Sequence, residues 1–268
     1  MKGVDPWSSG MVEDYDKLVK EFGMKSFNKR MNLDHLIFER NIVWSHRDFD
    51  KVFKRIKEKK NFINITGIAT TGHLHFGHKL ILDIFKLFKD LGGKNYFALS
   101  DIDSYTSRPK IKNMDEAKGY AVETAAHALA MGLAPGDIYI QSRENPRYYE
   151  FTFEISKKIT QNMYRAIYGN LDLGKISAVL LQISDILHPQ LDEYAGMMPS
   201  ITVIGAEQDP HTRLTRDIAR KFGLEIPSFL YIRHQSGLQA GKKMSASEPW
   251  TAIFLNDKPD EAKRKILN

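Results

Sequence analysis

Apolar runs of strand type alternate along this chain with stretches of helical periodicity that are ten or more residues long. Strands are expected at residues 61–68, 95–99, 137–141, 200–204 and 227–232. Helices are expected at residues 75–91, 114–131, 149–168, 176–187 and 211–222. Strands that alternate with helices in this way pair in parallel, and the helices cover both faces of the sheet. The alternation therefore predicts an α/β fold with a doubly wound parallel sheet.

The two ends of the chain differ from this pattern. Residues 1–45 are polar and irregular, which predicts an N-terminal extension with one short helix near residues 15–22. A charged amphipathic helix is expected next, at residues 46–60, because its apolar residues fall on one stripe. The main domain is expected to span residues 46–248, and residues 249–268 to hold one basic helix.

Composition narrows the class of protein. The 268 residues include no cysteine, which excludes disulfides, thiolate zinc sites and a cysteine nucleophile and suits a reducing cytoplasm. No apolar run approaches the ~18 residues that span a bilayer, and the first residues lack an apolar signal region. Lys and Arg number 39 against 33 Asp and Glu, a net charge of +6. This modest excess is compatible with a polyanionic partner but does not require one.

Three polar segments follow expected strands, at residues 67–78, 100–108 and 205–217. In doubly wound sheets, ligands bind beyond the carboxyl ends of the strands. These segments are therefore where a binding site is expected.

The first segment contains His75-Phe76-Gly77-His78 at a strand-to-helix turn. The free N–H groups at a helix start attract phosphate, and imidazoles can donate hydrogen bonds to phosphate oxygens. Gly77 leaves the backbone open to a base or a ribose. The pattern predicts a nucleotide-phosphate site, and its alternative is two histidines that cap the helix or lie on the surface.

The sequence Lys243-Met244-Ser245-Ala246-Ser247 lies in a loop rich in Gly, Lys and Ser. A mobile lysine can close over a pyrophosphate leaving group and stabilise its charge. The alternative for this segment alone is a solvated basic loop.

Together, these two segments resemble the HIGH and KMSKS motifs of class I aminoacyl-tRNA synthetases, which have a Rossmann-type, HUP-like sheet. Residues 205–217 are similar to the tryptophanyl members, and their Gln-Asp-Pro and Thr-Arg-Asp elements are absent from the tyrosyl relatives. The sequence Lys-Met-Ser-Ala-Ser resembles the form of archaeal and eukaryotic tryptophanyl enzymes, and Pro6-Trp7 with residues 14–18 is similar to the start of archaeal members. The resemblance covers the chain from about residue 6 to its end.

The resemblance implies a set of ATP-binding residues. His75, His78 and Lys243 would be catalytic and would contact the phosphates. The full ATP-binding set would be Thr71, Gly72, His75, Gly77, His78, Gly205, Glu207, Lys243, Met244 and Ser245. Because Ala246 replaces the second lysine of the general motif, Lys243 would carry more of the charge stabilisation.

The tryptophan pocket needs a polar acceptor for the indole N–H inside apolar surroundings. Asp185 resembles the helix aspartate that does this in bacterial tryptophanyl enzymes, and Gln182 shares its helix face. Gln208 matches a position that holds the amino-acid head group, and Asp101 and Asp103 are further pocket candidates. The alternatives are a surface carboxylate for Asp185 and turn or capping roles for Asp101 and Asp103.

The resemblance also implies partners. These are L-tryptophan, tRNA(Trp) and ATP with its accompanying Mg²⁺, and no side chain is assigned as a metal ligand. A homodimer is expected through a helical insertion at about residues 106–190. Residues 249–268 would begin a truncated C-terminal helical region, in which case the chain should activate tryptophan but charge tRNA poorly.

Three other functions remain open from the sequence. One is a small nucleotidylyltransferase, which shares the first motif, and another is tyrosine specificity. The third is a truncated, non-catalytic synthetase paralogue that binds RNA or a partner. Amino-acid-dependent ATP–pyrophosphate exchange separates them.

Overall fold

The parallel part of the sheet is arranged about a reversal of strand order. The structure is a computed structural model, and it describes residues 19, 22–27, 31–170, 172–239, 242–246 and 248–267. Within these residues seven strands form one sheet in the order β1-β2-β7-β6-β3-β4-β5. The strands are β1 Lys25–Ser26, β2 Val43–Arg47, β3 Phe62–Ala69, β4 Gly93–Ser100, β5 Ile138–Ile140, β6 Ser200–Gly205 and β7 Ser228–Ile232.

Strands β3 to β7 are parallel to one another, whereas β1 and β2 pair antiparallel at the β7 edge. Along the chain the sheet grows from β3 through β4 to β5, then returns to the other side of β3 with β6 and β7. The predicted doubly wound parallel fold is confirmed, with two antiparallel edge strands added.

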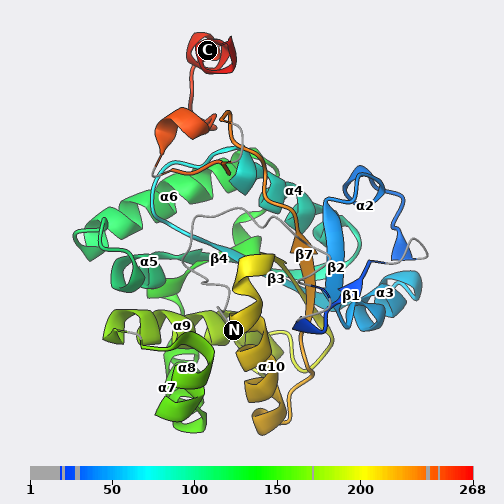
Figure 1. The fold of residues 1–268 in the computed structure, drawn as a ribbon. Coiled ribbons are helices and arrows are strands. Elements are labelled where there is room, and N and C mark those ends of the chain that lie inside the picture. Colours follow the sequence, from blue (N-terminus) through cyan, green and yellow to red (C-terminus); the bar gives the residue numbers. More distant parts are fainter. Residues whose placement is uncertain are drawn as a thin grey trace.

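Helices cover both faces of the sheet (Figure 1). On one face α3 and α4 pack over β3, β6 and β7, and α6 packs beside α4 over β4. On the other face α7 to α10 pack over β2 and β7. The helices are α2 Leu36–Glu39, α3 Phe49–Lys57, α4 Phe76–Asp90, α5 Asp101–Ser107, α6 Met114–Ala130, α7 Pro146–Lys158, α8 Gln161–Tyr168, α9 Leu173–Leu187, α10 Asp209–Phe222 and α11 Pro259–Leu267.

Strand β7 shows why this sequence makes a two-sided core. Leu230 and Ile232 belong to the cluster under α3 and α4, while Phe229 and Tyr231 belong to the cluster under α9 and α10. Side chains alternate across a strand, so consecutive apolar residues supply both faces at once. A run that is apolar throughout is what a strand buried on both faces requires.

The N-terminal prediction was wrong in one respect. The boundary expected between residues 45 and 46 falls inside β2, and the helix expected from residue 46 begins at Phe49. Arg47 at the end of β2 donates to both carboxylate oxygens of the fully buried Asp209, at 2.9 and 3.1 Å. This ion pair ties the edge strand to the start of α10. The short helix expected near residues 15–22 lies almost wholly outside the described residues.

Two other expectations need correction. The single helix expected at residues 149–168 is two helices, because Thr160 accepts the N–H of Met163 and caps a new start at α8. The expected insertion at residues 106–190 contains β5, which pairs with β4 in the main sheet. The helices inserted between β5 and β6 are α7 to α9.

In the part of the chain that the structure describes, no helix is both long and apolar enough to cross a membrane.

Candidate active site

Two adjoining cavities lie where the strand order reverses. Strands β3 and β6 are neighbours, and the chain leaves them toward opposite sides of the sheet. This reversal point opens a crevice beyond the carboxyl ends of the strands. Five residues line both cavities: Ile81, Arg108, Gly205, Glu207 and Gln208. Two ligand groups bound in the two cavities would therefore meet at this junction.

The first cavity brings together the segments predicted to bind ATP, and we call it the nucleotide cavity. Nine of the ten predicted residues line it: Thr71, His75, Gly77, His78, Gly205, Glu207, Lys243, Met244 and Ser245. Gly72 does not line it and instead lies beside Ala246. The turn after β3 and the late basic loop are therefore neighbours in space.

His75 and His78 are organised by the start of α4. His75 is the N-cap residue, and its Nδ1 accepts the N–H of Gly77 at 3.1 Å. His78 Nδ1 accepts the N–H of His75 at 3.2 Å. The two rings are stacked with their centroids 4.0 Å apart. The predicted capping role and the predicted place in the cavity therefore coexist in the same two residues.

Burial keeps both imidazoles neutral. Desolvation, together with the charge of Lys243, lowers the pKa of His75 to about 4. Desolvation, together with His75, lowers the pKa of His78 to about 3. Because each Nδ1 accepts a backbone N–H, the proton of each neutral ring is on Nε2. Each histidine can thus donate one neutral hydrogen bond, but it carries no positive charge near pH 7.

Gly77 and Gly205 permit close approaches that a larger residue would block. A Cβ on Gly77 would lie 2.9 Å from the His75 ring. A Cβ on Gly205 would lie 2.3 Å from the carboxylate of Glu207. The glycines therefore let His75 and Glu207 fold back over the backbone of the cavity wall.

Glu207 is held in an ionised state by its neighbours. Its Oε2 is 2.7 Å from Nε2 of His234, which also lines the nucleotide cavity. Burial opposes ionisation, but the hydrogen bond and charge of His234, aided by Lys243, keep the pKa of Glu207 below its usual value. A buried carboxylate of this kind can accept two hydroxyl hydrogen bonds, as the ribose of a nucleotide offers.

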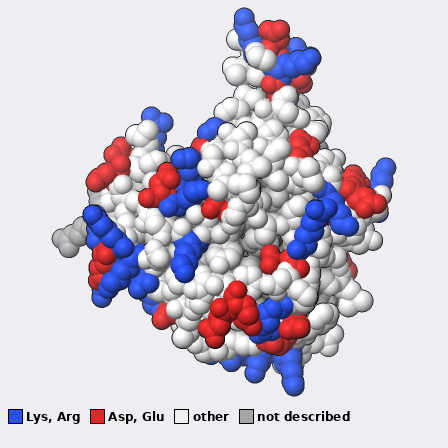
Figure 2. Space-filling view, turned by 180° about the vertical axis from the view of Figure 1, so that it is seen from behind, with Lys and Arg blue, Asp and Glu red and all other residues white. Residues whose placement is uncertain are grey.

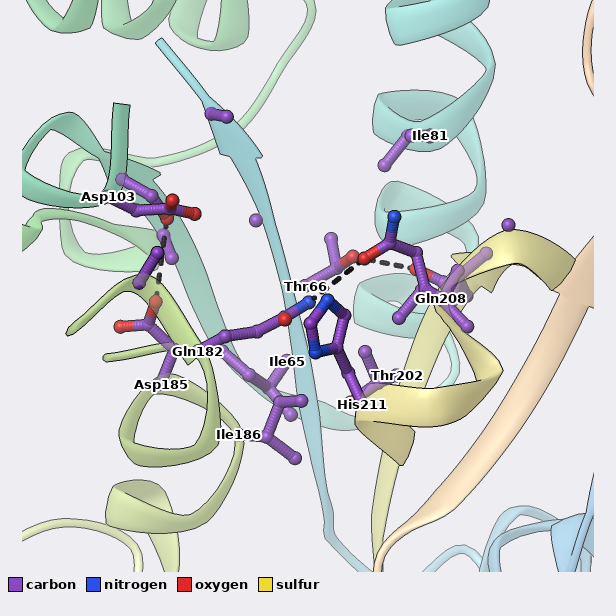
Figure 3. A pocket seen from close by; sticks show the side chains of 18 of the residues that line it. Ile65, Thr66, Ile81, Asp103, Gln182, Asp185, Ile186, Thr202, Gln208 and His211 are labelled. Carbon is purple, nitrogen blue, oxygen red and sulfur yellow. Dashed lines mark hydrogen bonds between the residues drawn. The ribbon is translucent and has the colours of Figure 1, made fainter. Parts of the chain in front are cut away.

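The second cavity lies between β3, β6 and α9, and we call it the amino-acid cavity. Figure 3 shows Asp103 and Asp185 at one end and Gln208 with His211 at the other, with Gln182 extending between them. Gln208 also lines the nucleotide cavity, whereas Asp185 does not. A ligand would thus place its reactive end near Gln208 and its distal end near Asp185.

Asp185 is the centre of a buried hydrogen-bond network. Its Oδ1 accepts the hydroxyls of Tyr139 at 2.9 Å and Tyr148 at 2.7 Å. Its Oδ2 accepts Nε2 of Gln141 at 2.9 Å and a longer contact from Ser100 at 3.5 Å. Burial raises the pKa of Asp185 to about 7, although the tyrosine hydroxyls oppose the rise. This carboxylate is fixed in position by four donors.

Of the two other predicted aspartates, Asp103 lines the amino-acid cavity and Asp101 does not. Burial raises the pKa of Asp103, which lines the amino-acid cavity as predicted, and Ser107 and Arg108 oppose the rise. Asp101 does not line the cavity. Its carboxylate accepts the N–H and hydroxyl of Ser142, at 2.9 and 2.5 Å, and the N–H of Ile102. The structure thus places Asp101 outside the amino-acid cavity, with its carboxylate bonded to Ser142 and to the first turn of α5.

A short segment after the basic loop supports the first motif. The N–H of Phe76 donates to Ile253 O at 3.2 Å, and that of Leu255 donates to Leu74 O at 2.8 Å. Phe254 lies between these bonds, with its ring 6.4 Å from the His75 ring. Sequence reasoning missed this segment because no pattern marks the pairing of two irregular stretches.

Sequence reasoning also missed several residues in and around the two cavities. Tyr139 lies on β5 and Gln141 directly after it, and both donate to Asp185. Their spacing of two was a readable sign that both face one side of the sheet. His234 was set aside for lack of metal-ligand spacing, and His211 was noted only as part of the segment at residues 205–217. His211 lines the amino-acid cavity, and its Nδ1 is 2.7 Å from the hydroxyl of Tyr168.

Comparison with known proteins agrees with this geometry. The family "tRNA synthetases class I (W and Y)" matches residues 57–268. A tryptophan–tRNA ligase of Hyperthermus butylicus is 36% identical over 98% of this chain and 74% of its own length. That of Methanocaldococcus jannaschii is 35% identical over the same shares. The crystal structure of tryptophanyl-tRNA synthetase from Aeropyrum pernix K1 matches with a TM-score of 0.88 and 37% identity, over 98% of this chain and 75% of that chain.

The fold and the pair of joined cavities define a class I aminoacyl-tRNA synthetase. Within that class, the tryptophanyl relatives above match 98% of this chain. The chain belongs to the tryptophanyl-tRNA synthetase family, as the sequence predicted.

Proposed function

We propose that this chain is a tryptophan–tRNA ligase. It would activate L-tryptophan with ATP to give tryptophanyl-adenylate and pyrophosphate, and then transfer the tryptophanyl group to tRNA(Trp). The observation that carries the proposal is the junction, where five residues line both cavities. A tryptophan bound in one cavity and an ATP bound in the other would bring carboxylate and α-phosphate together there.

In the activation step a carboxylate oxygen of tryptophan attacks the α-phosphorus of ATP. The new bond is a mixed anhydride, and the bond from the α-phosphorus to the bridging oxygen breaks, so that pyrophosphate leaves with the electron pair. No protein nucleophile and no proton transfer are needed. Catalysis then consists of positioning and charge stabilisation, by hydrogen bonds from His75 and His78 and by the charge of Lys243.

Tryptophan selection rests on Asp185 at the distal end of the amino-acid cavity. A carboxylate offers about four acceptor positions, and Asp185 already accepts four contacts. The contact from Ser100, at 3.5 Å, is the weakest of them. We propose that the indole N–H of tryptophan replaces it at Oδ2. A phenylalanine side chain would enter without a donor and would be rejected for lack of that bond.

The ATP would bring its own Mg²⁺. Among the described residues no group of three histidine or acidic side chains is arranged to hold a metal ion. Mg²⁺ is a hard cation that prefers oxygen ligands, and the oxygens of the triphosphate would supply several of them. The cavity residues would then bind the ATP–Mg²⁺ complex through the phosphates and the ribose.

The face of the molecule seen in Figure 2 bears on how tRNA would be bound. Figure 2 shows Lys and Arg intermixed with Asp and Glu around a largely neutral centre on the face seen from behind, and the projecting C-terminal end carries both colours. The net charge of +6 is not gathered into one basic patch on that face. We propose local phosphate contacts by separate cations rather than one continuous basic track.

A homodimer and a cytoplasmic location complete the proposal. Large apolar side chains are exposed on the helices after β4: Tyr105 on α5, Val122 and Leu129 on α6, and Phe153, 76% exposed, on α7. We propose that a partner subunit covers some of these side chains, as expected where exposed apolar residues gather into a patch. Sedimentation equilibrium of the purified chain tests the dimer, and a monomer at micromolar concentration would contradict it.

The deciding experiment for the ligase proposal is amino-acid-dependent ATP–pyrophosphate exchange with each amino acid in turn. Exchange with tryptophan supports the proposal. Exchange with tyrosine alone would change the substrate. A chain that exchanges with no amino acid would be a non-catalytic paralogue, and the proposal would be abandoned.

A further inference from the structure

Arg108 lies at the junction of the two cavities. It is the C-cap residue of α5, and it is one of the five residues that line both cavities. Among the described residues it is the one lysine or arginine that lines the amino-acid cavity. The same cavity is lined by three carboxylates: Asp103, Asp185 and Glu207. An incoming tryptophan would add a fourth through its own carboxylate.

The guanidinium of Arg108 is not committed to a structural contact. Across the described ranges, no ion pair or side-chain hydrogen bond holds it, and its charge acts on the nearby Asp103. Its backbone, in contrast, is fixed. Its N–H donates to Ser104 O at 3.1 Å, its O accepts from Ile111 at 3.0 Å, and Pro109 follows it. The backbone of Arg108 is therefore held by hydrogen bonds, while its half-buried guanidinium is available to bind a ligand.

The charges at the junction show what this cation can do. His75 and His78 are neutral, as their low pKa values require. Lys243 lines the nucleotide cavity but not the amino-acid cavity. Without Arg108, the tryptophan carboxylate would enter a half-buried space that holds carboxylates and no cation. Anions in such surroundings are strongly disfavoured unless a cation pairs with them.

We propose that Arg108 binds the carboxylate of tryptophan and holds it at the junction, facing the α-phosphate of ATP. A guanidinium matches a carboxylate with two parallel hydrogen bonds, which fixes direction as well as distance. Arg108 is thus a substrate-binding residue that selects for an amino acid over the corresponding amine. The inference rests on the proposed function, because it takes tryptophan as the occupant of the amino-acid cavity.

The test compares two ligands that differ only in the carboxylate. L-Tryptophan and tryptamine are titrated by calorimetry into the wild-type chain and into the variants Arg108→Gln and Arg108→Lys. We expect Arg108→Gln to weaken tryptophan binding by about tenfold or more, the usual effect of losing a charge-assisted hydrogen bond, and to leave tryptamine binding within about twofold. Arg108→Lys should regain part of the tryptophan affinity, because it keeps the charge but loses the paired geometry.

Lys112→Gln is the matched control. It removes the same charge four residues away, from an exposed side chain outside both cavities. It should leave both affinities unchanged. Equal weakening of tryptophan and tryptamine in Arg108→Gln would show that Arg108 only shapes the cavity, and unchanged tryptophan binding would show no contact. Either result overturns the inference.

The binding test is separate from the test of the proposed function. A wild-type chain that binds tryptophan but exchanges no pyrophosphate would overturn the ligase proposal and leave the role of Arg108 standing. A wild-type chain that does not bind tryptophan would overturn both.

Discussion

Gly72 and Ala246 lie against each other. A Cβ on Gly72 would be 3.7 Å from the Cβ of Ala246, and Gly72 has a φ of +153°, which few other residues adopt. The turn after β3 and the late basic loop touch here, at the edge of the nucleotide cavity, which Ala246 lines and Gly72 does not. This contact places Lys243 on the same wall as His75, although the two residues come from opposite ends of the sheet domain.

Lys243 is expected to act on the charge that leaves with pyrophosphate. Its charge lowers the pKa of both His75 and Glu207, which places its ammonium group near both side chains. Lys243→Ala should lower the tryptophan-dependent exchange rate by at least about tenfold, since one electrostatic donor is worth ~3–4 kcal/mol in a preorganised site. The measurement is kcat for exchange, with circular dichroism to confirm folding.

The adjacent lysine supplies the control. Lys242 does not line either cavity, and its Nζ is 2.7 Å from Glu248 in an exposed pair. Lys242→Ala should leave exchange within about twofold, because exposed ion pairs contribute little. If Lys243→Ala exchanged at the wild-type rate, or if Lys242→Ala fell equally, the role assigned to Lys243 would be withdrawn.

Asp185 is expected to select tryptophan by accepting its indole N–H. Asp185→Asn keeps the shape but turns one acceptor into a donor facing Tyr139, Tyr148 and Gln141. Tryptophan affinity should fall by about tenfold or more, while the KM for ATP stays within about twofold, since the residue lies outside the nucleotide cavity. Calorimetry with each ligand checks this, and unchanged tryptophan binding would remove Asp185 from the pocket.

The central strands were predictable because burial on both faces leaves an uninterrupted apolar run. Strand β2 was not, because Ser45, His46 and Arg47 are polar yet lie in or at the edge of the sheet. Their burial depends on partners distant in the chain, such as Asp209 for Arg47. Local sequence cannot show a polar strand that tertiary pairing buries.

Some residues of the candidate site could likewise be predicted from the sequence, and others could not. Motif residues such as His75 and Lys243 could be found because each stands in a short sequence motif that resembles those of class I aminoacyl-tRNA synthetases. Asp101 and Asp103 could not be told apart, because a short helix, α5, turns one toward Ser142 and the other toward the cavity. Arg108 follows on the same helix and was missed for the same reason. The direction in which a side chain points after a strand depends on the local backbone geometry, which the sequence alone does not reveal.

His188 is expected to make the fold sensitive to acid. Its ring lies 4.6–5.8 Å from the rings of Tyr96, Tyr139, Tyr148 and Tyr194, and its Nε2 has no partner among the described residues. Burial lowers its pKa to about 4, although the hydrogen bonds that the ring makes with the backbone of Ser184 and Asp185 oppose the change. The unfolded chain takes up a proton below about pH 6.5, and the folded chain does not.

Stability from His188 is therefore complete above about pH 6.5 and is lost as the pH falls toward 4, by up to ~1.4 kcal/mol per pH unit. His188→Gln should flatten this part of the urea-unfolding profile between pH 7 and 5. His127→Gln, which changes a less buried histidine on α6, should not. Equal slopes for His188→Gln and the wild type would contradict a buried neutral ring.

Phe254 is expected to hold His75 in its working position. Its N–H donates to Asp257 at 2.8 Å, and Lys265 of α11 donates to both carboxylate oxygens of Asp257, at 2.9 and 2.7 Å. The Lys265 ammonium also lies 4.8 Å from the centre of the Phe254 ring. Since Asp257 and Lys265 are both well buried, α11 braces the ring that packs against the first motif.

Removing that ring should affect rate more than binding. Phe254→Ala should lower kcat for exchange by about tenfold or more, because small displacements of a reacting group are costly, and should change the KM for ATP by less than about threefold. It should cost less stability than the ~3–5 kcal/mol of a fully buried phenylalanine, because the ring is only half-buried. Phe254→Tyr should keep the rate, since the ring remains. Trp250→Ala, at a nearby exposed aromatic, should change neither quantity. A wild-type kcat in Phe254→Ala would show that His75 needs no support from this ring.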